Sequence, residues 1–200
     1  MNNLLNKISA TVTASAVLSM AIALETANPA QAIEFNFSWQ GDAGYSALGT
    51  FNYDETTAPL IIAESGLGPT QYLQSLSVSF FDPSNTLLGT YNTVTGGVSD
   101  SPFFTFNFDT SNQSLFGNLD IGGGQSIDGE NFLQGTIGSK LELSQTTNQG
   151  TASIVVDQNS GAIAATQVPE PAAVLGLLAF GALGATLKGK KKLVSQKADA

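Results

Sequence analysis

From Ile33 to Trp39 the chain alternates strictly between apolar and polar side chains. A period of two is typical of a β-strand with one face buried and the other in solvent. The segment from Tyr45 to Tyr53 repeats the pattern after a glycine-rich turn. Together the two segments predict a β-hairpin.

Further short strands are predicted as far as residue 156. The segments with this pattern are residues 76–80, 87–91, 104–108, 115–121, 132–137, 141–144 and 152–156. The apolar run 60–62 fits either a buried strand or one helical turn. Between the strands, Asp82-Pro83-Ser84-Asn85 places proline where a type I turn favours it. Eight to nine strands joined by such turns predict an all-β fold, either an antiparallel β-sandwich or a flattened barrel.

The N-terminal 32 residues have a different pattern, which predicts a signal helix. Lys7 precedes a moderately apolar stretch from Ala10 to Leu24, and Ala30-Gln31-Ala32 closes the segment. A basic start, an apolar centre and small residues at the A-x-A positions are typical of a cleavable export signal. We expect signal peptidase to cut after Ala32, with an uncleaved anchor or an amphipathic helix as the alternative.

The C-terminal 39 residues also depart from the strand pattern. Residues 162–171 read as a linker that ends in Val168-Pro169-Glu170-Pro171, so the β-rich domain is expected to cover residues 33–161. Residues 172–187 contain no charge and predict a transmembrane helix. Sixteen helical residues span about 24 Å, short of a hydrocarbon core of about 30 Å, and lysine side chains can cover part of the difference.

A basic tail, residues 188–200, follows this apolar segment. Lys188, Lys190, Lys191 and Lys192 lie at its start, and the positive-inside rule predicts that they stay in the cytoplasm. The body of the chain would then lie across the membrane, with Pro-Glu-Pro at the outer interface in an extended form that a protease can bind. A plain tail anchor, in which the prolines only mark the start of the helix, is the alternative.

The charge distribution excludes some classes of partner. Between residues 33 and 168, thirteen acidic side chains face the single cation Lys140, which gives a formal charge of −12. Such a domain should be repelled by nucleic acid and by anionic lipid surfaces.

The chain contains no cysteine, histidine or arginine. Thiol and imidazole chemistry and the commonest zinc ligands are therefore excluded. We expect no catalytic residue, no metal site and no cofactor, and we expect that the protein is not an enzyme.

The order of Val168-Pro169-Glu170-Pro171, an apolar helix and a lysine cluster resembles the PEP-CTERM sorting signal of Gram-negative envelope proteins. The resemblance implies recognition and removal of the signal by an exosortase, a membrane-embedded cysteine protease, and transfer to the cell surface or the exopolysaccharide matrix. This chain carries lysine where the family usually carries arginine. The body is also similar to the ectodomains of cyanobacterial members, and no residue role follows from that similarity.

Several side chains are candidates for a binding or catalytic role in the body. Asp120, Asp128 and Glu130 flank a glycine-rich loop and could bind calcium, although ordinary turn acids would look the same. Another set opens turns just after an aromatic residue, which predicts Asx-turn hydrogen bonds: Asp54, Asp82 and Asp109.

The aromatic residues are expected to form the core. Phe104, Phe106 and Phe108 recur at period two, and the single tryptophan, Trp39, makes a weak platform for sugar. The leading hypothesis is a non-enzymatic structural or interaction protein of the cell envelope or matrix. A carbohydrate- or calcium-dependent adhesin is the first alternative, and a glycan-processing enzyme that uses two carboxylates is the second.

Overall fold

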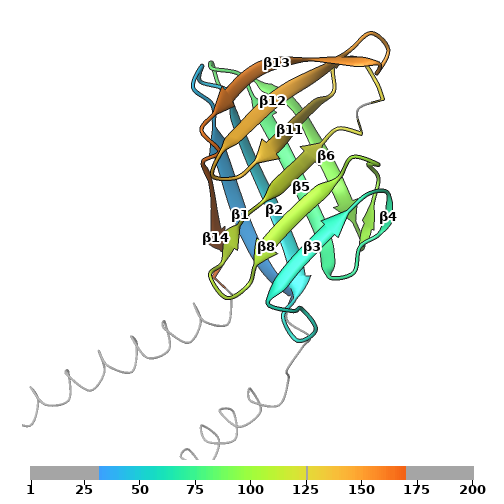
Figure 1. The fold of residues 1–200 in the computed structure, drawn as a ribbon, viewed down its shortest axis with the longest axis vertical. Coiled ribbons are helices and arrows are strands. Elements are labelled where there is room, and N and C mark those ends of the chain that lie inside the picture. The colour runs from blue at the N-terminus through green and yellow to red at the C-terminus, as the bar shows by residue number, and fades with distance from the viewer. Residues whose placement is uncertain (1–31, 125, 170–200) are drawn as a thin grey trace, which may run out of the picture. The chain divides into compact units, whose positions relative to one another are not determined.

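The computed structural model describes residues 32–124 and 126–169, which fold into two antiparallel β-sheets (Figure 1). The first sheet, called sheet A, has the strand order β14 (Ile163–Gln167), β1 (Ala32–Gln40), β2 (Ser46–Asp54), β5 (Leu73–Phe81), β6 (Leu87–Thr95), β7 (Val98–Ser99) and β4 (Gly68–Pro69). The second, sheet B, has the order β13 (Ala152–Asn159), β12 (Lys140–Thr147), β11 (Asn131–Thr136), β10 (Asn118–Gly122), β8 (Thr105–Asp109) and β3 (Ile61–Ser65). The short β9 (Ser114–Leu115) pairs with β8.

The predicted all-β fold is therefore confirmed, with two antiparallel sheets in the described residues, and Ile61 and Ile62 of the ambiguous run 60–62 lie in strand β3. Within the described ranges no helix is long and apolar enough to cross a membrane. The predicted signal helix and transmembrane helix lie outside the described residues.

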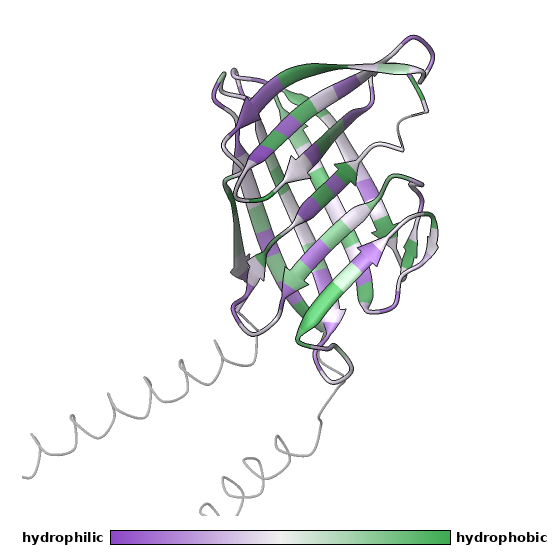
Figure 2. Cartoon of the chain, in the orientation of Figure 1, coloured by the Kyte–Doolittle hydropathy of each residue, from purple (hydrophilic) through white to green (hydrophobic). Residues whose placement is uncertain are grey.

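The alternation read from the sequence is the alternation between core and solvent. Figure 2 shows apolar and polar bands following one another along the strands. In β1 the buried residues are Ile33, Phe35, Phe37 and Trp39, and their neighbours in sequence are exposed. Burial of these side chains, about 25 cal/mol per Å² of apolar surface, is the main stabilising contribution to the sandwich.

Stacked and edge-on aromatic rings connect the two sheets. Phe35 stacks on Phe51 with ring centroids 5.2 Å apart within sheet A. Phe108 of sheet B meets Phe35 and Phe51 edge-on at 4.9 Å, and Phe106 meets Phe51 in the same way. The prediction that Phe104, Phe106 and Phe108 lie in the core is confirmed, and the ring geometries are those of favourable aromatic pairs.

Strand β14 corrects the predicted domain boundary. Residues 162–168 were expected to form a linker, but Ile163–Gln167 pairs along β1, with Ile163 opposite Trp39 and Gln167 opposite Phe35. Asn159 stabilises the turn between β13 and β14, because its Nδ2 donates hydrogen bonds to the carbonyls of Gln40 and Ala162, both at 2.8 Å. The small side chains of this segment resemble a linker, yet backbone pairing needs no large apolar residue.

Two buried carboxylates hold loops in place. Glu64 in β3 accepts hydrogen bonds from the backbone N–H groups of Gln71, Tyr72 and Leu73. Asp157 in β13 accepts from the N–H groups of the β1–β2 turn, Ala43 at 2.9 Å and Tyr45 at 3.0 Å. Both carboxylates belong to sheet B and bind backbone from segments that lead into sheet A, so they join the two layers.

Candidate functional site

The expected sorting segment begins where β14 leaves the sheet. Val168 N–H still donates to the carbonyl of Glu34 at 2.8 Å, and Gln113 Nε2 donates to Gln167 Oε1 at 3.0 Å. Pro169 is exposed and has no N–H with which to continue the pairing. Val168, the residue directly before the Pro-Glu-Pro tripeptide, is therefore still bonded to the sheet.

The predicted signal-cleavage position lies at the same end of the sandwich. Ala32 is the first residue of β1 and pairs with Asp54, whereas Ile33 is buried and pairs with Tyr53. Because β1 and β14 are antiparallel neighbours, the start of β1 and the end of β14 lie side by side (Figure 1). Cleavage after Ala32 stays a prediction, and it would leave every core residue of β1 in place.

The other residues of the predicted signals lie outside the described part of the chain. These are Ala30, Glu170, Pro171, Lys188, Lys190, Lys191 and Lys192.

The three acids considered for calcium have separate surroundings. Asp128 Oδ1 accepts from the N–H groups of Gln149 and Gly150, and Glu130 Oε2 accepts from those of Ser126 and Ile127. Asp120 lies within β10, opposite Gln134 of β11. Among residues 32–124 and 126–169, no group of three or more potential ligands lies close enough to hold a metal ion.

The acids that follow aromatic residues form the predicted turns. Asp82 Oδ1 accepts from the N–H groups of Ser84 and Thr86, both at 2.8 Å. Asp54 accepts from Thr56, and Asp109 accepts from Ser111 and Asn112. Hydrogen bonds from the Thr56 side chain and backbone hold the pKa of Asp54 below its ordinary value, and the Ser111 hydroxyl has the same effect on the pKa of Asp109.

A pair of carboxylates interacts beside the glycine-rich loop. Partial burial raises the pKa of Asp100, and the negative charge of Glu130 raises it further. Glu130 already accepts two backbone hydrogen bonds within its own loop. The Glu130 carboxylate therefore shapes that loop.

Trp39 and Lys140 take structural positions. The Trp39 side chain is 2% exposed and belongs to the core, so it offers no platform to a ligand. Lys140, the only cation of the described body, forms an ion pair with Glu142 at 2.5 Å. An exposed pair of this kind contributes at most about 1 kcal/mol.

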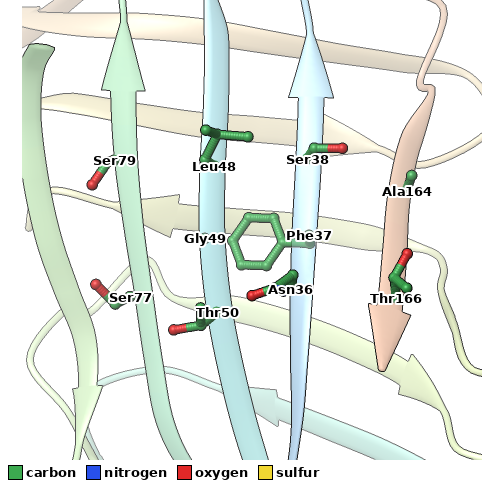
Figure 3. Close-up of a pocket in the computed structure, with 10 residues that line it drawn as sticks. All are labelled: Asn36, Phe37, Ser38, Leu48, Gly49, Thr50, Ser77, Ser79, Ala164 and Thr166. Atoms are coloured by element: carbon green, nitrogen blue, oxygen red, sulfur yellow. The ribbon is translucent and has the colours of Figure 1, made fainter. Parts of the chain in front are cut away.

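The outer face of sheet A carries a shallow hollow of about 450 Å³, shown in Figure 3. Hydroxyl and amide side chains from four strands surround it: Asn36, Ser38, Thr50, Ser77, Ser79 and Thr166. At its centre the Phe37 ring lies over Gly49. A Cβ added to Gly49 would lie 2.2 Å from that ring. This surface could not be predicted from the sequence, because single serines and threonines on the solvent face of a strand do not indicate a binding site.

Comparison with known proteins identifies one segment. The model of the PEP-CTERM protein-sorting motif matches residues 167–192, from the last residue of β14 through the lysine cluster. No curated protein and no solved structure gives a significant match, so the resemblance of the body to cyanobacterial ectodomains stays a prediction. Motifs of this class are recognised by exosortases and accompany export with C-terminal membrane anchoring before processing. The chain therefore carries a PEP-CTERM protein-sorting motif at residues 167–192, in the place expected from the sequence.

Proposed function

We propose that the protein is cut from its C-terminal membrane segment by an exosortase-type enzyme and serves a structural or interaction role, without catalysis, at the cell surface or in the extracellular matrix. The observation that carries the proposal is the sorting motif at residues 167–192, which starts at the end of an edge strand of the sandwich.

The geometry of the two ends supports this proposal. Ala32 and Pro169 emerge beside each other, because β1 and β14 are antiparallel partners. A domain whose entry and exit lie together can remain folded on one side of a membrane while both ends are processed. Val168 N–H donates to the carbonyl of Glu34, so the residue that precedes the tripeptide is held within the sheet.

The chemistry of the body supports a role other than catalysis. Glu64, Asp82, Asp109, Asp128 and Asp157 each accept backbone hydrogen bonds that shape turns and loops. The chain contains no histidine, cysteine or arginine that could act together with these acids.

Replacing the tripeptide tests the proposal. In cells that contain the sorting enzyme, the triple variant Pro169→Ala, Glu170→Ala, Pro171→Ala should reduce the amount of protein outside the membrane fraction at least tenfold. Full-length chain should accumulate in the membrane, because the extended recognition site would become regular helix. Immunoblotting of the fractions measures both quantities.

Thr166→Ala is the matched control, since Thr166 is exposed and precedes the motif by one residue. This variant should be released like the wild type. Equal release of the triple variant would contradict exosortase processing. An epitope after Ala200 that is accessible from outside intact cells would contradict the proposed topology.

A further inference from the structure

A second, smaller cleft lies beside the hairpin that joins β12 to β13. It has a volume of about 210 Å³ and is lined by Phe103, Phe132, Thr146, Gly150, Thr151 and Ser153. One water molecule takes about 30 Å³ in the liquid, so a single water would leave most of the space unfilled. We call this space the hairpin cleft.

An unpartnered hydroxyl lies at the cleft. Thr146 is 2% exposed, and its Oγ1 has no hydrogen-bond partner in the described protein. Ser144, two residues earlier on the same strand, is also fully buried with an unpartnered Oγ. A buried hydroxyl without a partner destabilises the folded state, so a ligand that bonds to Thr146 would remove that penalty.

A β-bulge explains why these polar side chains face inward. The register of β12 against β13 shifts between Leu143 and Ser144. Beyond this point Ser144 and Thr146, rather than their neighbours, are the buried residues. Bulges re-aim side chains in this way and are frequent beside binding and active sites.

An exposed aromatic ring also lines the cleft. Phe103 is 51% exposed, whereas its neighbour Phe104 is buried in the core. An exposed ring offers a face on which the C–H side of a sugar can pack, while hydroxyls of the same sugar bond to polar groups. Thr146, Thr151 and Ser153 supply such groups within the same cleft.

The wall at Gly150 is held rigidly. Asn148, Gln149 and Gly150 all have positive φ angles, of 55°, 56° and 79°. Asp128 Oδ1 fixes them by accepting from the N–H groups of Gln149 and Gly150. The negative charge of the Asp128 carboxylate, which is hydrogen-bonded to this segment, should repel an acidic ligand.

We propose that the hairpin cleft binds one uncharged sugar residue, stacked on Phe103 and hydrogen-bonded to Thr146. The lining residues carry no charge, in a domain whose formal charge is −12. The inference deepens the proposed function, because it names neutral polysaccharide as the partner that a surface or matrix protein would bind. The binding assay needs no processing at the C-terminus, so the two proposals can fail separately.

Saturation-transfer NMR on the full chain tests the inference, in a detergent that has no sugar headgroup. The probes are glucose, galactose, mannose and N-acetylglucosamine, with glucuronic acid as the charged comparison. At least one neutral sugar should bind with a millimolar Kd, and glucuronic acid should bind at least tenfold more weakly. Phe103→Ala and Thr146→Val should each weaken the binding at least tenfold.

Thr146→Val also separates a binding role from a structural one. Because this variant removes a hydroxyl without a partner, its Tm should equal or exceed that of the wild type while sugar binding falls. Phe116→Ala is the matched control, since Phe116 is an exposed phenylalanine outside the cleft, and it should bind like the wild type.

Three outcomes would overturn the inference. The first is that no neutral sugar binds, in which case the cleft holds water only. The second is that binding persists in both cleft variants. The third is that binding is lost in Thr50→Val, which lies on the outer face of sheet A, and kept in the cleft variants.

Discussion

At the residue scale, the acids of the described body act mainly through hydrogen bonds to nearby backbone. The Asx turns at Asp54, Asp82 and Asp109 could be predicted from sequence, because donor and acceptor lie within four residues of each other. The roles of Glu64 and Asp157 could not be predicted. The partners of Asp157 lie up to 114 residues away, and only the fold brings them together.

The lowered pKa of Asp109 predicts a pH dependence of stability. A carboxyl group whose pKa is lower in the folded state stabilises that state above the ordinary value of 3.8, and this contribution is lost as the pH falls through the folded pKa. Asp109→Asn should therefore have a lower Tm than the wild type at pH 7, and the difference should close below pH 3.8. Thermal unfolding followed by circular dichroism between pH 2 and 7 measures this.

Asp100 supplies a control of opposite sign. Its raised pKa means that the folded state binds the proton more tightly, so its charged form destabilises the fold above the raised pKa. Asp100→Asn should raise the Tm at pH 7 or leave it unchanged. A pH-independent deficit in Asp109→Asn would show that geometry, and not the charge, is what the turn requires.

At the element scale, the long strands follow directly from period-two alternation, and β1 matches its predicted side-chain pattern residue by residue. Strand β14 and the two-residue strands β4 and β7 were not predicted, because their side chains carry little of the apolar signal. The predicted strand 115–121 is divided in the structure into β9 and β10. The hairpin cleft could not be predicted either. Thr146 reads as an exposed position until the bulge at Leu143/Ser144 reverses the faces of β12.

Glu64 should be the most sensitive single acid of sheet B. Its carboxylate is 7% exposed and accepts from three consecutive backbone N–H groups. Glu64→Gln replaces one acceptor oxygen by an NH2 donor that faces these N–H groups. We expect a loss of about 3 kcal/mol in the free energy of unfolding, measured by urea denaturation.

Glu55→Gln is the matched control, because Glu55 is exposed in the turn after β2. Its free energy of unfolding should change by less than about 0.5 kcal/mol. If the two variants lose the same stability, the loop after β3 is held by other contacts.

At the scale of the whole molecule, the β-rich body leads directly into the sorting motif, which begins at the last residue of β14. The PEP-CTERM motif at residues 167–192 could be read from the sequence and is confirmed, whereas the N-terminal export signal stays a prediction. The sequence did not predict how close the motif lies to the folded body. Val168 N–H donates to the carbonyl of Glu34 within the sheet, and Pro169, the first residue of the tripeptide, follows directly.

The intact mass of the exported protein tests the central claim most directly. The account predicts a chain that begins at Ile33 and lacks about 30 residues at its C-terminus, which places the cut at Pro169 to Pro171. A mass that includes residues 172–200 in protein recovered from outside the cell would contradict sorting by C-terminal removal.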